Sequence, residues 1–305
     1  MILCAGEALI DMLPRETVAG EAAFAPYAGG AVFNTAIALG RLGARTGFFT
    51  GLSTDLFGEM LAEALTASKV TSLADRSDRP TTLAFVTLTK GHARYAFYDE
   101  NTAGRMLAPA DLPKLPKAVK AVFLGGISLM VEPCGTAYEA LMKREAGARV
   151  TMLDPNIRPG FIKDEAAYRA RIGRMMALAD IVKVSDEDLH WLLGKGRTAD
   201  LAREILAMGP KLVCITEGAA GARGVTAAGE VLVEGAAVEV ADTVGAGDTF
   251  NAGVLAALDK AAALSKKAVA ALDEATVRAA LSLGCRAAAV TVSRAGANPP
   301  WSHDL

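Results

Sequence analysis

Short apolar runs alternate with amphipathic stretches along most of this chain, and this alternation limits its fold more than any other feature. Four apolar runs have the length expected of central strands: Ala121–Leu124, Val150–Leu153, Ile181–Val184 and Leu212–Thr216. Helical periodicity is found between them: Pro133–Ala146, Glu165–Ala179, Asp186–Leu193 and Ala199–Met208. Strands that alternate with helices predict a three-layer α/β/α architecture, in which a mostly parallel sheet has helices on both faces.

The ends of the chain continue this pattern. Ile2–Ala5 is expected to be a short buried strand, and Ala31–Leu42 and Leu56–Ala67 are expected helices separated by an extended segment, Thr46–Leu52. Glu274–Val292 is a long alanine-rich helix that needs close packing against another element. No repeat, low-complexity tract or linker interrupts the chain, so we expect residues 1–305 to form a single domain.

Two regions break the rhythm and predict a small antiparallel flap outside the main sheet. Glu21–Tyr27 and Thr82–Tyr98 look extended, and neither is followed promptly by a helix. Within the second, alternating residues flank Lys90-Gly91-His92, a hairpin signature. We therefore expect lid segments at about 21–28 and 82–98, with apolar Phe85 and Phe97 closing over a ligand. The alternative is an edge hairpin without such a role.

Composition excludes several classes of protein. The 305 residues carry a formal net charge of −2 without a basic cluster, which argues against a nucleic-acid partner. No run approaches 18 uncharged apolar residues, so no membrane span is expected. The N-terminal residues lack the basic start of a signal peptide. The four cysteines lie far apart in apolar runs and form no metal-ligand motif, so reduced thiols in a cytoplasmic protein are expected.

One segment suggests chemistry. A strand-like run, Val231–Val240, leads through the small residues Gly245, Ala246 and Gly247 to a helical stretch that starts with Asp248. Such a turn places bare backbone N–H groups at the positive end of a helix dipole, where a phosphate is favoured. Asp248 is either a simple helix cap or a base that accepts a proton from a nucleophile while the amides hold a phosphoryl group.

Polar residues also follow the first strand and the next predicted turn. Asp11 lies in an apolar setting, where an unpaired carboxylate is costly. It is therefore either paired within the protein or placed to accept hydrogen bonds from substrate hydroxyls. Gly29 and Gly30 form a turn that lets a ligand approach the backbone, and Asn34 lies in the first turn of the helix that follows. Most Gly-Gly turns, however, only reverse the chain.

Three more predicted strand ends carry candidate side chains. Asp154-Pro155-Asn156-Ile157-Arg158 places polar residues at alternating positions, and Arg158 offers a fork for an anion or a hydroxyl pair, although turn formation alone explains Asp and Asn here. Lys183–Asp188 is a good helix start, with Glu187 and Asp188 as candidates to approach hydrated magnesium. Thr216–Gly221 is a glycine turn suited to contact with phosphate or ribose.

Two other nucleotide-binding folds do not match. The chain contains no GxxxxGK[ST] loop, and it has only Gly6 where a dinucleotide-binding fold requires GxGxxG after its first strand. The three histidines, His92, His190 and His303, are isolated in the sequence and form no triad or zinc motif with a neighbour.

Two motifs in this order resemble the ribokinase-like, or PfkB-type, carbohydrate kinases over essentially the whole chain. The first is Gly29-Gly30-Ala31-Val32-Phe33-Asn34, and the second, specific even alone, is Asp242–Phe250 with its Gly245-Ala246-Gly247-Asp248 core. Gly6–Asp11 and Asp154–Pro159 are most similar to the bacterial fructokinase branch.

The resemblance implies roles for individual residues, with ATP and Mg²⁺ as cofactors. The sugar is then held between sheet and flap by Asp11, Gly29, Gly30, Asn34 and Arg158. The anion hole and the base are Gly245, Ala246, Gly247 and Asp248. The nucleotide lies along the C-terminal half, near Lys183, Ser185, Thr216, Gly218 and Gly221.

The chain departs from the family at the implied metal sites. The usual Asn-x-x-Glu motif reads Ser185 and Asp188 here, and the shorter Asp188 reaches magnesium only through water. Many members also bind a monovalent cation such as K⁺, at positions that correspond to Asp242, Val244, Thr291, Arg294 and Gly296. Pro300 stands where some relatives have a serine ligand.

The resemblance implies an ATP-dependent kinase that phosphorylates a sugar hydroxymethyl group, with fructose to fructose 6-phosphate as the first expectation. A 2-keto-3-deoxygluconate kinase is the alternative, in which Arg158 grips the substrate carboxylate; a ribokinase or nucleoside kinase follows. A sugar-binding regulatory protein is the non-enzyme alternative, although binding alone needs no base at Asp248. Exposed strands on the flap suggest a homodimer.

Overall fold

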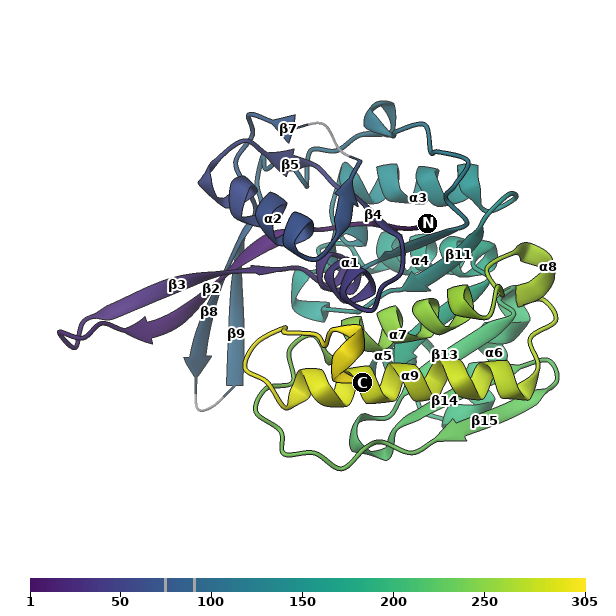
Figure 1. Cartoon of the computed structure of the whole chain (residues 1–305). Helices are drawn as coiled ribbons and strands as arrows, with labels where there is room; N and C mark the ends of the chain where they lie inside the picture. The colour runs from purple at the N-terminus through teal and green to yellow at the C-terminus, as the bar shows by residue number, and fades with distance from the viewer. Residues whose placement is uncertain (74–75, 90–91) are drawn as a thin grey trace.

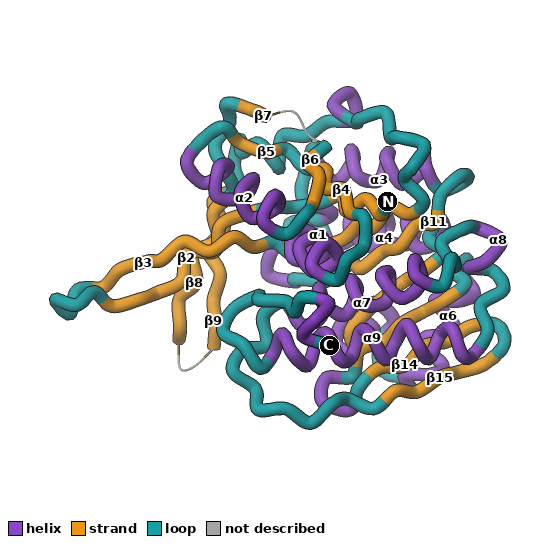
Figure 2. The backbone as a smooth tube through the Cα atoms, in the orientation of Figure 1, coloured by secondary structure: helices purple, strands orange, loops and turns teal. Residues whose placement is uncertain are grey.

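The computed structural model describes residues 1–73, 76–89 and 92–305. Among these, the main sheet has nine strands, and seven neighbouring ones run parallel (Figures 1 and 2). In spatial order they are β15 (Gly229–Val233), β14 (Ala222–Thr226), β13 (Leu212–Thr216), β12 (Ile181–Ser185), β11 (Val150–Asp154), β10 (Ala121–Gly125), β1 (Ile2–Ala5), β4 (Thr46–Phe49) and β6 (Val70–Ser72). The order reverses at β1, where an open α/β sheet has its ligand-binding crevice.

Helices cover both faces of this sheet. On one face lie α1 (Ala31–Arg41), α2 (Leu56–Ala67), α7 (Ala246–Lys260) and α9 (Glu274–Val292), with the short α8 (Lys266–Val269) beside them. On the other lie α3 (Cys134–Glu145), α4 (Glu165–Leu178), α5 (Asp186–Leu193) and α6 (Thr198–Met208). The three-layer α/β/α prediction is confirmed.

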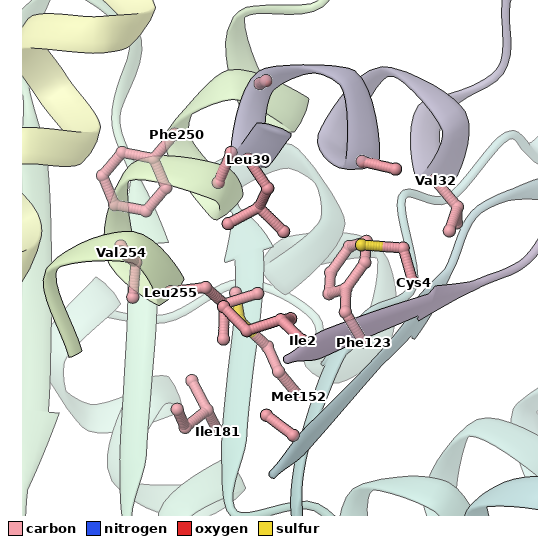
Figure 3. Packing of buried hydrophobic residues seen from close by; sticks show 14 of the residues in the cluster. Ile2, Cys4, Val32, Leu39, Phe123, Met152, Ile181, Phe250, Val254 and Leu255 are labelled. Carbon is pink, nitrogen blue, oxygen red and sulfur yellow. The ribbon is translucent and has the colours of Figure 1, made fainter. Parts of the chain in front are cut away.

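The pleat of each strand divides the core into two layers. Ile2 and Cys4 of β1 face the first helix layer, whereas Leu3 and Ala5 face the second. Figure 3 shows the first layer, where Phe123, Met152 and Ile181 from successive strands meet residues of α1 and α7. These strands are buried on both faces, which explains why their sequences read as continuous apolar runs.

A second sheet forms the predicted flap, which is called the lid below. Its strands are β3 (Ala22–Gly29), β2 (Leu9–Glu16), β8 (Leu83–Thr89) and β9 (His92–Tyr98), and it projects from the side of the body in Figure 1. It consists of two antiparallel hairpins joined by a short parallel pairing of Ile10–Met12 with Leu83–Phe85. Lys90 and Gly91 of the expected turn lie outside the described residues.

Some expectations were wrong in detail. The strand predicted over Val231–Val240 ends at Val233, because Val233 pairs with Ala222, the first residue of β14, and the chain beyond it finds no partner strand. Strand β2 was missed, because Pro14 and the charged residues after it hide its alternation. Thr46–Leu52 is divided into β4 and the short β5 (Leu52–Ser53), which pairs with β7 (Arg76–Ser77).

Helix α9 packs closely on α7, as its alanine-rich sequence requires. By length and composition it is the one helix in the described part of the chain that could cross a membrane. Here, however, it lies against α7, β14 and β15, and it carries the exposed residues Arg278 and Arg286. The two helices approach closely at Gly253 and Gly284, where a Cβ on Gly253 would lie 2.6 Å from the Gly284 Cα.

This contact predicts opposite effects for two glycine-to-alanine changes. Gly253→Ala forces α7 and α9 apart and is expected to lower the free energy of unfolding by about 1–3 kcal/mol. Gly173→Ala, at an exposed position of α4, meets no atom within 4 Å and is expected to raise it by about 0.5–1 kcal/mol through helix propensity. Urea unfolding of both variants measures this. Equal effects would show that the α7–α9 contact is not tight.

Candidate active site

A cleft of about 670 Å³ lies at the carboxyl ends of the parallel strands. Residues that follow β1, β10 and β11, and the last residues of β12 and β13, line one side of it. The start of α7 and the lid residue Phe97 complete it. Because this edge is also where the strand order reverses at β1, the cleft occupies the expected ligand position of an open α/β sheet.

The start of α7 forms one wall of the cleft. Gly245 has a left-handed conformation (φ +79°), and a Cβ there would lie 2.9 Å from the Ala297 Cβ, so both backbone and packing favour glycine. Gly247 and Asp248 lie in the first turn, where backbone N–H groups have no acceptor within the helix. Gly245, Ala246 and Gly247 all line the cleft, so this turn is suited to an anion.

Asp248 is buried beside these amides and is held by α1. The Asn34 Nδ2 donates a hydrogen bond of 2.9 Å to the Asp248 Oδ2, and the Thr35 hydroxyl donates one of 3.2 Å to its backbone carbonyl. Burial raises the pKa of Asp248 to about 7; the nearby Asp154 adds to this rise, whereas the Asn34 hydrogen bond and Lys183 oppose it. Among the described residues, the Asp248 carboxylate accepts its hydrogen bond from Asn34 and not from an N–H of α7, so capping does not account for its position. A pKa raised in this way is typical of functional carboxyl groups.

A buried ion pair lies next to the same turn. The Lys183 ammonium, on β12, donates to the Asp154 Oδ2 at 3.0 Å, and the Asn251 amide donates to the same oxygen at 2.7 Å. A Cβ on Gly247 would lie 3.0 Å from the Lys183 Nζ, so the lysine approaches the anion-binding turn directly. Burial acts to lower the pKa of Lys183, but Asp154 and Asp188 outweigh it and the pKa lies above its usual value. The turn thus combines bare amides with a fixed positive charge.

The lid contributes Asp11 to the cleft. Asp11 lies on β2 with its carboxylate against Gly29, where a Cβ would lie 2.2 Å from the Asp11 Oδ2. No group in the described residues donates a hydrogen bond to it, and burial raises its pKa to about 6. An unpaired, half-buried carboxylate in a cleft is suited to accept hydrogen bonds from ligand hydroxyls.

Aromatic and cationic side chains complete the lid side. Phe97 of β9 packs against Phe161, with ring centroids 4.6 Å apart, and both line the cleft. Arg158 also lines the cleft and binds only a neighbouring backbone carbonyl, that of Ile157, among the described residues. Phe85, expected to cover the ligand with Phe97, instead packs against Phe24 and Tyr98 and is not among the cleft residues. Phe85 pairs with Ala96 of β9, and Phe97 is the next residue along that strand. Because successive side chains of a strand point to opposite faces of a sheet, Phe85 and Phe97 lie on opposite faces of the lid.

Ser185 and Asp188 form the start of α5 and also line the cleft. The Ser185 hydroxyl accepts the Asp188 N–H, and the Asp188 Oδ2 accepts the Ser185 N–H, a reciprocal capping box. The Asp188 Oδ1 accepts the Ile157 N–H at 3.0 Å, so Asp188 also fixes the loop that carries Arg158. Each carboxylate oxygen thus has a structural partner.

The expected nucleotide turn is only partly in the cleft. Thr216 lines it, whereas Gly218 and Gly221 do not. Both glycines have positive φ, and a Cβ on Gly221 would lie 2.1 Å from the Val233 carbonyl oxygen. Gly221 is therefore needed for the turn between β13 and β14.

The residues expected at a monovalent-cation site come together beside α7. The Asp242 carboxylate accepts the N–H of Val244 and that of Gly296, both at 3.0 Å. Thr291 is buried and donates to Thr249 of α7 at 2.9 Å. The backbone N–H of Arg294 donates a hydrogen bond to the backbone carbonyl of Thr291. Two loops far apart in sequence thus meet at the start of α7.

Glu7 and Asn251 are two further buried residues of this region, and no sequence motif predicted their positions. Glu7 lines the cleft, and its carboxylate accepts the N–H groups of Ala31 and Ser128. Burial raises the pKa of Glu7 above its usual value, although hydrogen bonds from its own backbone and from Ser128 oppose the rise. Glu7 lies two residues after the buried strand β1, and Asp154 is the last residue of β11, so a carboxylate at the carboxyl end of a strand was the available signal.

Together, an anion-binding helix start, a buried carboxylate and a polar cleft under a lid define a phosphotransferase that acts on a small hydroxyl compound. Comparison with known families is specific. The pfkB family carbohydrate kinase pattern matches residues 1–304, and the chain belongs to this family.

Individual relatives agree with this family. The chain is 58% identical over 279 residues to a fructokinase of Rhizobium leguminosarum bv. trifolii. The matched segment covers 91% of this chain and 86% of the relative. The crystal structure of an ATP-bound fructokinase from Xylella fastidiosa has a TM-score of 0.87 at 28% identity, covering 97% of this chain and 93% of that one. A Vibrio cholerae fructokinase double mutant, with fructose, ADP and potassium bound, has a TM-score of 0.85 at 26% identity and the same coverage.

The raised pKa of Asp248 predicts a stability effect that depends on pH. Because the carboxyl holds its proton in the folded state up to about pH 7 but only to about pH 4 when unfolded, folding stability falls as pH rises between these values. Asp248→Asn removes this penalty. Its unfolding free energy should exceed that of the unaltered chain by about 1–4 kcal/mol above pH 7, and the difference should vanish below pH 4. Urea unfolding across pH measures this; a pH-independent difference would contradict the burial effect.

Proposed function

We propose that this chain is an ATP-dependent fructokinase that transfers the γ-phosphoryl group of ATP to the 6-hydroxyl of fructose. The observation that carries this proposal is the 58% identity to the Rhizobium fructokinase over most of both chains. The fructokinase structures with ATP and with fructose and ADP support the choice of substrates. Given ATP as co-substrate and the free thiols of all four cysteines, we place the enzyme in the cytoplasm.

The site residues suggest how the transfer proceeds. The fructose hydroxyl oxygen forms a bond to the γ-phosphorus as the bond to the ADP oxygen breaks, and Asp248 accepts the hydroxyl proton. The amides of Gly245–Gly247 and the Lys183 ammonium stabilise the charge on the transferred group. Asn34 orients the base. A carboxyl with a pKa near 7 suits this role, because it is both ionised and basic near neutral pH.

We assign the fructose-binding roles to the lid and the adjacent turns. Asp11 accepts hydrogen bonds from sugar hydroxyls, Gly29 and Gly30 allow close approach, and Arg158 donates to hydroxyls. Phe97 and Phe161 exclude water from the reacting groups. A 2-keto-3-deoxygluconate kinase is the alternative, with Arg158 on a substrate carboxylate. The carboxylates of Glu7 and Asp11 in the same cleft disfavour an acidic substrate.

The proposed nucleotide and metal sites rest on the chemistry of the donors. Lys183, Ser185 and Thr216 lie in the cleft and contact the nucleotide, whereas Gly218 and Gly221 shape the turn beside it. In the described residues, no group of three or more acidic, histidine or cysteine side chains can hold a metal ion. Asp188, whose two carboxylate oxygens already accept backbone N–H groups, would hold through water an Mg²⁺ ion that binds together with the ATP phosphates. Bound there, Mg²⁺ supplies neutralisation of phosphate charge.

We propose K⁺ as an activating ion at the loops that meet beside α7. The backbone carbonyls near Asp242, Val244, Thr291, Arg294 and Gly296 would hold it. The Asp242 carboxylate supports this proposal, because it fixes both loops through Val244 and Gly296. Potassium is present in the Vibrio cholerae structure.

A coupled ATP-consumption assay tests the function. We expect fructose to be preferred over 2-keto-3-deoxygluconate, ribose, tagatose and adenosine, with Mg²⁺ required and K⁺ raising turnover. Asp248→Asn should retain fructose binding but lose about 10²–10⁴-fold in turnover, the contribution of a positioned base. Preference for the keto-acid would favour the alternative kinase. Sugar binding without ATP consumption in the unaltered chain would indicate a binding protein.

We also propose that two copies associate through the lids. The outer strands β3 and β9 have open edges within the described lid, and Phe24, Tyr27 and Tyr98 are exposed there. Sedimentation equilibrium should give the mass of a dimer, and Phe24→Ser with Tyr98→Ser should shift it toward the monomer. A monomeric mass for the unaltered chain at micromolar concentration would contradict the proposal.

A further inference from the structure

Glu7 has an unusual position for a residue that the proposed chemistry does not use. It follows β1, is 8% exposed and lines the cleft. Its two carboxylate oxygens accept N–H groups from two different parts of the chain: Oε1 from Ala31 at 3.1 Å and Oε2 from Ser128 at 3.3 Å. Burying a carboxylate is costly, so such a residue needs a compensating role.

The first hydrogen bond caps helix α1 from another element. The residue at the N-cap position is Gly30, which has no side chain to satisfy the first N–H groups of the helix. The Glu7 carboxylate does this instead and lies at the positive end of the helix dipole. Gly30 has a φ of +106°, and a Cβ there would lie 3.2 Å from the Glu7 Cγ, so the turn is built around this side chain.

The capped turn of α1 carries both side chains that bind Asp248. Asn34 binds its carboxylate at 2.9 Å, and Thr35 binds its backbone carbonyl at 3.2 Å. The orientation of Asp248 therefore depends on where α1 begins. That start is fixed by Glu7.

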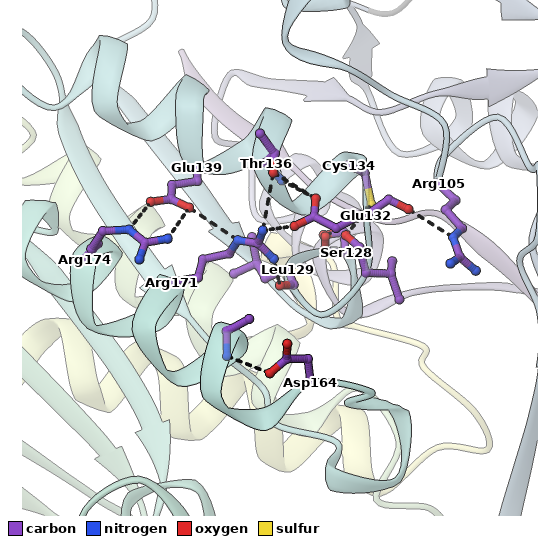
Figure 4. Close-up of polar contacts among 12 residues, drawn as sticks. Arg105, Ser128, Leu129, Glu132, Cys134, Thr136, Glu139, Asp164, Arg171 and Arg174 are labelled. Atoms are coloured by element: carbon purple, nitrogen blue, oxygen red, sulfur yellow. Dashed lines mark hydrogen bonds and ion pairs between the residues drawn. The ribbon is translucent and has the colours of Figure 1, made fainter.

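The second hydrogen bond connects Glu7 to a rigid turn. Ser128 and Leu129 belong to η2 (Ile127–Leu129), which Figure 4 shows held by side chains of two helices. The buried Arg171 of α4 donates to the Leu129 carbonyl at 2.9 Å, and the Cys134 thiol donates to the Ser128 carbonyl at 3.2 Å. Arg171 is in turn paired with Glu132 and Glu139. Glu7 thus connects the start of α1 to a turn that is held by the opposite helix layer.

Steric contacts show that space is reserved for this carboxylate. Gly126, just before η2, has a φ of +71°, and a Cβ there would lie 1.9 Å from the Glu7 Oε1. A side chain at Gly126 would displace the carboxylate from Ala31.

We propose that Glu7 is a positioning residue for the proposed catalytic base: by joining the start of α1 to η2, it holds Asn34 and Thr35 in register with Asp248. This inference rests on the proposed function for its kinetic consequence. Its structural part, the fixed start of α1, does not depend on the substrate.

The variant Glu7→Gln tests the proposal. Glutamine has nearly the same shape, but its NH₂ group cannot accept an N–H, so one of the two connections is lost. We expect turnover to fall about 10–100-fold, the effect of a small misplacement of a reacting group, while the KM for ATP stays unchanged. Unchanged turnover in a folded variant would overturn the proposal.

The pH profile separates positioning from a simple loss of charge. The groups that face Asp248 are Asn34, Asp154, Lys183 and Arg158. A weaker Asn34 hydrogen bond raises the pKa of Asp248, so the acid limb of turnover should move to higher pH in Glu7→Gln. Loss of a nearby negative charge alone would move it to lower pH, and that outcome would also overturn the proposal.

Asp180→Asn is the matched control. Asp180 is equally buried, accepts the Thr151 N–H at 2.8 Å and pairs with Lys266 at the opposite edge of the sheet. Its loss should lower the melting temperature without changing the KM or the pH profile. If Glu7→Gln behaves in the same way, its role is structural only.

Amide hydrogen exchange tests the connection without an activity assay. In Glu7→Gln, peptides covering residues 30–35 and 127–129 should exchange faster, whereas those from α4 should not. If Glu7→Gln does not fold, Glu7→Asp keeps the charge but is too short to reach both N–H groups, and the same changes are expected. A chain that does not phosphorylate fructose refutes the proposed function. Unchanged exchange in a folded variant refutes the role of Glu7.

Discussion

The hydrogen bond between Asn34 and Asp248 joins residues 214 positions apart, and the rest of the site depends on it. It forms because α1 and α7 both begin at the carboxyl edge of the sheet and pack side by side on one face. Each helix presents its first turn to the other. The N-terminal half, with the proposed sugar turn, and the C-terminal half, with the proposed anion-binding turn, therefore meet at one carboxylate.

Hydrogen bonds from neighbouring residues compensate for the burial of charged groups around this carboxylate. Asp154 is almost fully buried, but it accepts hydrogen bonds from Lys183, Asn251 and the Asn156 backbone. A buried ion pair adds little net stability, because desolvation offsets most of its attraction. What it provides is position: the ion pair holds the Lys183 ammonium beside Gly247. Preorganisation of this kind avoids rearrangement when charge develops in a reaction.

The sequence was informative where one local pattern decides the structure. The helices Leu56–Ala67, Asp186–Leu193 and Glu274–Val292 have the predicted bounds, because caps and periodicity agree there. Asp248 could be located by its glycines, and Asp11 by its apolar setting. The hydrogen-bond partners of buried residues could not be predicted in this way. No local signal in the sequence shows that Asn251 contacts Asp154 or that Glu7 contacts Ser128. These contacts form only when strand ends that are far apart in the sequence come together in the fold. A single sequence does not show which strand ends become neighbours.

The lid is attached to the body in a way that affects the cleft. Its two hairpins are joined through the three-residue parallel pairing of β2 with β8, and Asp11 is the middle residue of that pairing on β2. Asn34 and Asp248, in contrast, belong to the body. A molecule bound to both sets of side chains would therefore connect the lid to the body. Binding of such a molecule would therefore be coupled to the position of the lid over the cleft.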